Sequence, residues 1–182
     1  MGYPFRTISL LAISVVCATN LGLAQEVVNA SAGRVLRTET LLPVPSDAVW
    51  QAFSTEQGLA EWVAPVVAID LRAGGSLLTH YDTDAAIGDP GTITTGILNF
   101  LEGELITFKV ELNENFSEQL QAEDVNLQEI VQIKSEGENL TRVVSSMVGW
   151  GSGPEWDAAY DFFVRGNEWT YRQLREALAP DQ

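Results

Sequence analysis

The chain has 182 residues, of which 25 are Asp or Glu and 10 are Lys or Arg, so its formal net charge is −15. This charge argues against a nucleic-acid partner, whose phosphates require a basic surface, and against docking on anionic lipid headgroups. Hydrophobic residues make up 46% of the chain, which excludes a disordered polymer and indicates one globular domain.

Residues 1–24 have the pattern of a cleavable secretory signal peptide. Arg6 is their only charged residue, an apolar stretch follows it, and small residues precede a cleavage point after Ala24. Two alternatives are a retained membrane anchor, for which the apolar stretch is short and interrupted, and a lipoprotein that would use Cys17. We expect cleavage, no membrane segment in the mature chain, and a secreted or periplasmic location.

Cleavage after Ala24 would remove the single cysteine of the chain. The mature protein would then have no disulfide and no thiol nucleophile, so a hydrophobic core must hold it together. Residues 25–33 are polar and small, which is typical of a flexible leader. We expect one domain over residues 34–179.

The domain is predicted to begin with a strand and two short helices. The strand covers Arg34–Val44, and prolines close it. Ser46 is a suitable N-cap for a helix over Asp47–Phe53, in which apolar residues recur at helical spacing. A second helix is expected from Ser54 to Trp62, with a capping box of Ser54 and Gln57 at its start.

Alternating polar and apolar residues then continue for much of the chain. This pattern predicts three hairpins, joined by turns that contain glycine, and therefore an antiparallel meander. The six expected strands are Val66–Leu71, Ser76–Asp82, Thr92–Leu101, Leu105–Leu112, Leu127–Ser135 and Leu140–Trp150.

The domain is predicted to end in one long helix over Glu155–Leu178. Pro154 is favourable at the first helical position, and the next proline is Pro180. Apolar residues form a broad stripe along this helix, so one face must pack against the sheet. The order of elements predicts an α+β fold with helices segregated from the sheet.

Four segments make the chain resemble the START-like, or SRPBCC, superfamily, and within it the branch named for homology to the activator of the Hsp90 ATPase. They are Pro45–Trp62, Ala73-Gly74-Gly75, Gly88-Asp89-Pro90-Gly91 and Gly149–Asp157. The resemblance extends from about Val35 to Leu178. It implies a helix-grip fold, in which a curved sheet wraps around the C-terminal helix and leaves an apolar cavity. Members bind hydrophobic small molecules, and some branches convert them.

Five aromatic residues are candidates for lining such a cavity. Ligand pockets are mostly apolar, with a few polar groups that orient the ligand. Each aromatic residue taken singly is more often an ordinary core residue, because Trp and Tyr bury large areas wherever a helix packs on a sheet. The candidates are Trp62, Trp150, Trp156, Tyr160 and Phe163.

His80 is the one side chain that would titrate near neutral pH without perturbation, so a general base would be sought there first. An enzyme of cyclase, hydratase or esterase type would use His80 with Tyr81 or Asp89. An orienting or solvated histidine is the favoured interpretation, because no nucleophile is placed beside it. We include His80 among the candidate cavity residues and expect no catalytic residue.

Metal and cofactor motifs fail on spacing. Asp82-Thr83-Asp84 opens like a calcium loop but lacks the required glycine and final acid. The glycines from Gly149 to Gly153 lack the βαβ context of a dinucleotide site. We expect no metal and no cofactor.

Glu111–Glu138 contains eight acids and one base, Lys134, which is typical of a solvated edge, although a docking surface for a basic partner is an alternative.

The leading hypothesis is therefore an exported, non-catalytic binding protein for an apolar small molecule. The alternative is a cavity-based enzyme that uses His80. A third interpretation, activation of a chaperone as the branch name suggests, conflicts with export because Hsp90 and ATP are cytoplasmic. The sequence leaves the ligand and the oligomeric state open.

Overall fold

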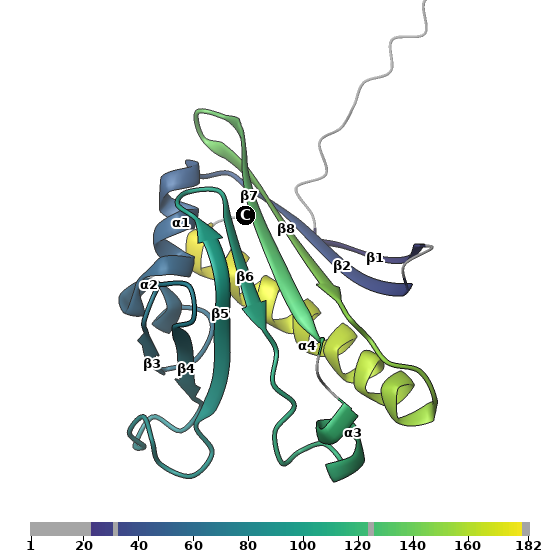
Figure 1. Ribbon diagram of the computed structural model, residues 1–182. Coiled ribbons are helices and arrows are strands. Elements are labelled where there is room, and N and C mark those ends of the chain that lie inside the picture. Colours follow the sequence, from purple (N-terminus) through teal and green to yellow (C-terminus); the bar gives the residue numbers. More distant parts are fainter. Residues whose placement is uncertain (1–22, 31–32, 124–125, 180–182) are drawn as a thin grey trace, which may run out of the picture.

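A computed structural model describes residues 23–30, 33–123 and 126–179, and only the backbone of the first of these ranges. Eight antiparallel strands form one sheet in the order β1-β2-β8-β7-β6-β5-β4-β3. Figure 1 shows this sheet curving across helix α4. The strands are β1 Leu23–Ala30, β2 Gly33–Leu42, β3 Val66–Ile69, β4 Ser76–His80, β5 Ile93–Leu101, β6 Leu105–Lys109, β7 Gln128–Gly137 and β8 Leu140–Val148.

The helices lie on one side of this sheet, with α4 as the longest element. They are α1 Ser46–Ser54, α2 Glu56–Ala60, α3 Glu118–Glu123 and α4 Pro154–Leu178. Strands β3 to β8 follow each other as a meander, β2 pairs with β8, and β1 pairs with the other side of β2 at the edge of the sheet. The predicted α+β helix-grip architecture is therefore confirmed, with the long C-terminal helix against a curved antiparallel sheet.

Four local details differ from the sequence-based expectations. Residues 25–33 were expected to be a flexible leader, but Leu23–Ala30 pairs along its whole length with β2. The short helix α3 was not predicted. The cap of α2 is Thr55, whose hydroxyl accepts a hydrogen bond from the Gly58 N–H at 3.0 Å, and not Ser54. Likewise α1 begins at Ser46 itself, with no side-chain cap.

The predicted signal peptide lies almost entirely outside the described residues. Its last two residues, Leu23 and Ala24, are the first two of β1. Signal cleavage and location therefore stay predictions. In the ranges that the structure describes, no helix has the length and apolarity needed to cross a membrane.

The core consists of two clusters at different positions along α4. The first contains Trp50, Phe53 and Trp62 from the α1–α2 region, which pack with Tyr171 and Leu174 in the C-terminal half of α4. The second gathers around Trp156 and Tyr160 at the N-terminal end of the helix. α3 lies beside the N-terminal end of α4, because Trp156 Nε1 donates a hydrogen bond to Glu123 Oε2 at 3.0 Å.

Candidate functional site: a cavity between the sheet and helix α4

A cavity of about 560 Å³ lies between the sheet, α2 and α4, and side chains of both core clusters line it. The first cluster contributes Phe53, Trp62 and Phe108, and the second contributes Met147 and Phe163. Most of the lining is apolar or aromatic. This size and lining are typical of small-molecule sites, which span roughly 300–1,000 Å³.

The side-chain periodicity of strands and helices determines which residues of each element reach the cavity. In and just after β4, Leu77, Thr79 and Tyr81 line it, because alternate residues of a strand share a face. On α4 the lining residues recur at helical spacing. They are Phe163, Gly166, Asn167, Thr170 and Tyr171, with exposed Phe162 and Trp169 beside them.

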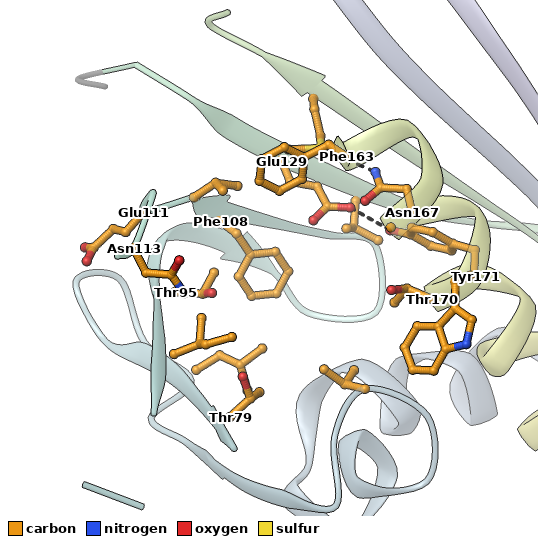
Figure 2. A pocket seen from close by; sticks show the side chains of 18 of the residues that line it. Thr79, Thr95, Phe108, Glu111, Asn113, Glu129, Phe163, Asn167, Thr170 and Tyr171 are labelled. Atoms are coloured by element: carbon orange, nitrogen blue, oxygen red, sulfur yellow. Dashed lines mark hydrogen bonds between the residues drawn. The ribbon is translucent and has the colours of Figure 1, made fainter. Parts of the chain in front are cut away.

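A carboxyl group, that of Glu129 on β7, reaches the cavity from the sheet. Its Oε1 accepts two hydrogen bonds, from Ser145 Oγ at 2.6 Å and from the Tyr171 hydroxyl at 2.9 Å. Figure 2 shows the Glu129 side chain directed across the cavity towards Tyr171 on α4. Sheet and helix are thus joined through one carboxylate oxygen at the cavity wall.

The surroundings of Glu129 perturb both titrating groups of this cluster. Burial raises the pKa of the Glu129 carboxyl, and the hydrogen bonds from Ser145 and Tyr171 offset this only in part. Burial, together with the neighbouring Glu129 charge, holds the pKa of Tyr171 well above its ordinary value of 10.0. Tyr171 therefore stays a neutral hydrogen-bond donor over the physiological pH range.

Aromatic side chains surround the opening of the cavity. Among the described residues, the large apolar side chains that remain exposed are Tyr81, Leu98, Leu101, Phe162 and Trp169. The three aromatic ones, Tyr81, Phe162 and Trp169, all line the cavity. Exposed apolar groups that gather at one place indicate a contact surface rather than scattered surface residues.

Two of the six residues predicted for the cavity line it, namely Trp62 and Phe163. Trp150, Trp156 and Tyr160 do not, because they pack against one another at the N-terminal end of α4. The Trp150 ring lies 4.8 Å from the Tyr160 ring and 6.5 Å from the Trp156 ring, centroid to centroid. A role in ligand binding stays a prediction for Trp62 and Phe163 and has no geometric basis for these three.

The polar atoms of this aromatic group are all used within the protein. Trp150 Nε1 donates to the Met147 carbonyl at 3.0 Å, and the Tyr160 hydroxyl donates to the Val35 carbonyl at 3.3 Å. The guanidinium of Arg34 lies 4.6 Å from the centre of the Tyr160 ring. This end of the helix is therefore filled core.

His80 also lies outside the cavity lining, on the face of β4 opposite to Thr79. Its Nδ1 accepts a hydrogen bond from the Asp82 N–H at 3.0 Å, so Nε2 carries the proton and donates to the Pro90 carbonyl at 3.0 Å. Both ring nitrogens hold the loop after β4. Asp89 likewise accepts from the Ala86 N–H within that loop. The favoured interpretation of His80 as an orienting residue agrees with this geometry.

Glu129, Tyr171 and Asn167 are among the polar cavity residues that the sequence-based search missed. Glu129 belongs to the acidic stretch predicted to be solvated, and this prediction is wrong for it, because it shares the inward face of β7 with Val131. The signal was present in the sequence. Leu127, Glu129, Val131 and Ile133 alternate strictly, so a charged residue stands where an apolar one is expected.

Solved structures with the same fold are numerous but distant in sequence. A conserved protein of unknown function from Enterococcus faecalis is 14% identical, with a TM-score of 0.62 over 87% of this chain and 79% of that one. The Aha1 dimer from Colwellia psychrerythraea is 13% identical, with a TM-score of 0.61 over 79% and 95%. CalU16 from Micromonospora echinospora is 17% identical, with a TM-score of 0.61 over 88% and 85%.

At these identities the likeness shows the fold alone. No curated protein is similar enough to this chain to count as a match. The family itself is nevertheless clear, because residues 43–179 match it over most of the chain. The chain belongs to the family described as activator of Hsp90 ATPase homolog 1-like proteins.

Proposed function

We propose that this protein is an exported binding protein for an apolar small molecule and that it has no catalytic role of its own. The observation that carries the proposal is the cavity of about 560 Å³, enclosed by aromatic and aliphatic side chains from the sheet, α2 and α4. A small ligand gains most of its affinity by burying apolar surface in such a space.

The arrangement along α4 supports binding in the cavity rather than on the surface. Gly166 lines the cavity, and a Cβ built at this position would meet no atom within 4 Å. A helical position that faces the interior would ordinarily carry a side chain, because close packing leaves few voids. Here the missing side chain leaves room for a molecule that is not part of the protein.

Other observations bear on the alternatives. The enzymatic interpretation depended on His80, whose ring nitrogens are both engaged by the loop after β4.

Export is supported by the sequence of residues 1–24, and it would separate the protein from cytoplasmic chaperones. Amino-terminal sequencing of the protein from the secreted or periplasmic fraction tests export. The proposal requires a mature N-terminus at Gln25.

Blocking the cavity tests the binding proposal directly. We expect wild-type protein to bind the neutral fluorophore prodan, with an increase and blue shift of its emission as it enters an apolar environment. Gly166→Leu places a side chain into the cavity and should lower the affinity by about tenfold or more, because the ligand and the new side chain compete for one space. Fluorescence titration measures both dissociation constants.

Ala158→Leu is the matched control, because Ala158 lies on the same helix and is exposed. This variant adds the same apolar surface outside the cavity, so it should bind prodan as the wild type does. Circular dichroism must show both variants folded. Equal prodan affinity in folded Gly166→Leu and wild-type protein would falsify binding in this cavity.

A further inference from the structure

The charged side chains that line the cavity are acidic. Glu111 and Glu129 are its ionisable acids, and among the described residues it contains no Lys, Arg or His. Glu111 is exposed, whereas Glu129 lies inside, between β7 and α4. An apolar molecule that carries its own carboxylate would therefore meet negative charge with no positive group to offset it.

Beside Tyr171, the polar atoms that remain open towards the cavity include two hydrogen-bond acceptors. Oε1 of Glu129 already accepts from Ser145 and Tyr171, so both of those hydroxyl protons are used. No hydrogen bond to Oε2 of Glu129 is found within the described part of the chain. Asn167 donates one Nδ2 proton to Met147 Sδ at 3.3 Å, which leaves its other Nδ2 proton and its carbonyl oxygen for further partners.

These two acceptors come from opposite walls. Glu129 projects from β7 and Asn167 from α4, and Figure 2 shows both side chains in the same part of the cavity, beside Tyr171. Asn167 and Tyr171 are four residues apart, which places them on one face of the helix. A ligand group that satisfies both acceptors must donate more than one hydrogen bond.

Among the described residues, none forms an ion pair with Glu129. A buried carboxylate is costly unless it is paired, and burial raises the pKa of Glu129. Aromatic rings of Trp62, Phe108 and Phe163 line the same cavity. Ring faces attract cations, and desolvation strengthens this attraction.

We propose that the ligand is an apolar primary amine, whose ammonium group is held by Glu129 Oε2 and the Asn167 side-chain carbonyl while its apolar body fills the cavity. This inference rests on the proposed binding function and names the chemical class of its ligand. The ammonium supplies hydrogen-bond donors to both acceptors and a positive charge, which the described lining of the cavity does not contain. The same arrangement disfavours fatty acids and other apolar carboxylates.

Three probes with one apolar chain and different head groups test the proposal: octylamine, 1-octanol and octanoate. Each is titrated into wild-type protein that carries prodan, at pH 7.5, and displacement gives the dissociation constant. Octylamine should bind about tenfold to a hundredfold more tightly than 1-octanol, as expected for hydrogen bonds to a charged group. Octanoate should bind most weakly.

Glu129→Gln should remove this preference, because it keeps the shape of the side chain and abolishes its charge. Octylamine affinity should fall to near that of 1-octanol, whose own affinity should change little. Glu111→Gln is the matched control and should preserve the preference, because Glu111 is exposed. If Glu129→Gln does not fold, Asn167→Leu provides the second variant and should weaken octylamine more than 1-octanol.

The outcomes separate this inference from the function on which it rests. If no probe displaces prodan and prodan itself does not bind, the binding function fails. If all three probes bind with similar affinity, the cavity binds ligands but the amine inference is wrong. The inference is also overturned if folded Glu129→Gln keeps the wild-type preference for octylamine, or if octanoate binds most tightly to the wild type.

Discussion

The two ends of helix α4 both pack against aromatic side chains but use them differently. At the N-terminal end, Trp156 and Tyr160 pack into a cluster in which each polar atom has a protein partner. Further along, the helix presents Gly166 and Asn167 to a cavity in which acceptor atoms stay open. The comparison teaches that aromatic content alone does not mark a binding site. What distinguishes the cavity is a missing side chain and unsatisfied polar groups.

The largest expected effect is at the filled end. Trp156 is 3% exposed, and its ring packs against Trp150. Trp156→Ala should lower the free energy of unfolding by about 3–5 kcal/mol, because it leaves a void in a packed cluster. Urea denaturation followed by circular dichroism measures this. Prodan affinity of the folded variant should be unchanged, and a loss of stability below about 1 kcal/mol would show that this end is not closely packed.

The same substitution at two glycines should have opposite signs. A Cβ at Gly151 would lie 2.2 Å from Trp156 Nε1, whereas a Cβ at Gly166 would meet nothing. Gly151→Ala should destabilise the protein by about 1–3 kcal/mol through overpacking. Gly166→Ala should stabilise it by about 0.5–1 kcal/mol through helix propensity.

Thermal unfolding of both glycine variants beside the wild type compares the two ends directly. The melting temperature should fall for Gly151→Ala and rise for Gly166→Ala. Two shifts of the same sign would contradict the contrast between a filled end and an open one.

A smaller, pH-dependent effect is expected at Glu129. Because burial raises its folded-state pKa above 4.5, the folded protein holds this proton more tightly than the unfolded chain does. The stability that Glu129 contributes is therefore fully present below pH 4.5 and is lost as the pH rises through the raised pKa. Gln does not titrate, so the stability of Glu129→Gln relative to the wild type should increase over that window.

Glu39, on β2, is the matched control for this pH dependence. Although burial raises its pKa, hydrogen bonds from Arg142 and Arg37 outweigh this and lower the pKa below 4.5. Glu39→Gln should therefore lose stability relative to the wild type as the pH rises towards 4.5. Urea titrations between pH 3 and pH 8 measure both slopes, and parallel slopes would contradict the different environments of the two carboxyl groups.

The fold could be read from the sequence because its signals are local. Alternation predicted the strands β3 to β8, and Pro154 with the apolar stripe after it predicted α4. β1 was missed because it shows no alternation: Val27 and Val28 are adjacent and stand among polar and small residues. Its strand conformation is established by pairing with β2 along its whole length.

The site was predictable only in part, for a similar reason. Trp62, Phe163, Trp156 and Tyr160 are all aromatic residues that were candidates for lining the cavity, and nothing in their spacing separates cavity from core. Glu129 could have been found, because it interrupts an apolar alternation. Counting it with its acidic neighbours concealed that signal.

The pairing of β2 with β8 has a consequence for when the binding site forms. Leu36 lies opposite Met147, and the Tyr160 hydroxyl meets the carbonyl of Val35, 125 residues earlier. Contacts between such distant segments form late, because a long loop must close before they contribute. A nascent chain that lacks α4 has no Asn167 and no Tyr171, so the site cannot exist during most of synthesis. A ligand that contacts Asn167 and Tyr171 can therefore bind only after α4 has been synthesised, and the exposed lining residues Phe162 and Trp169 lie on that same helix.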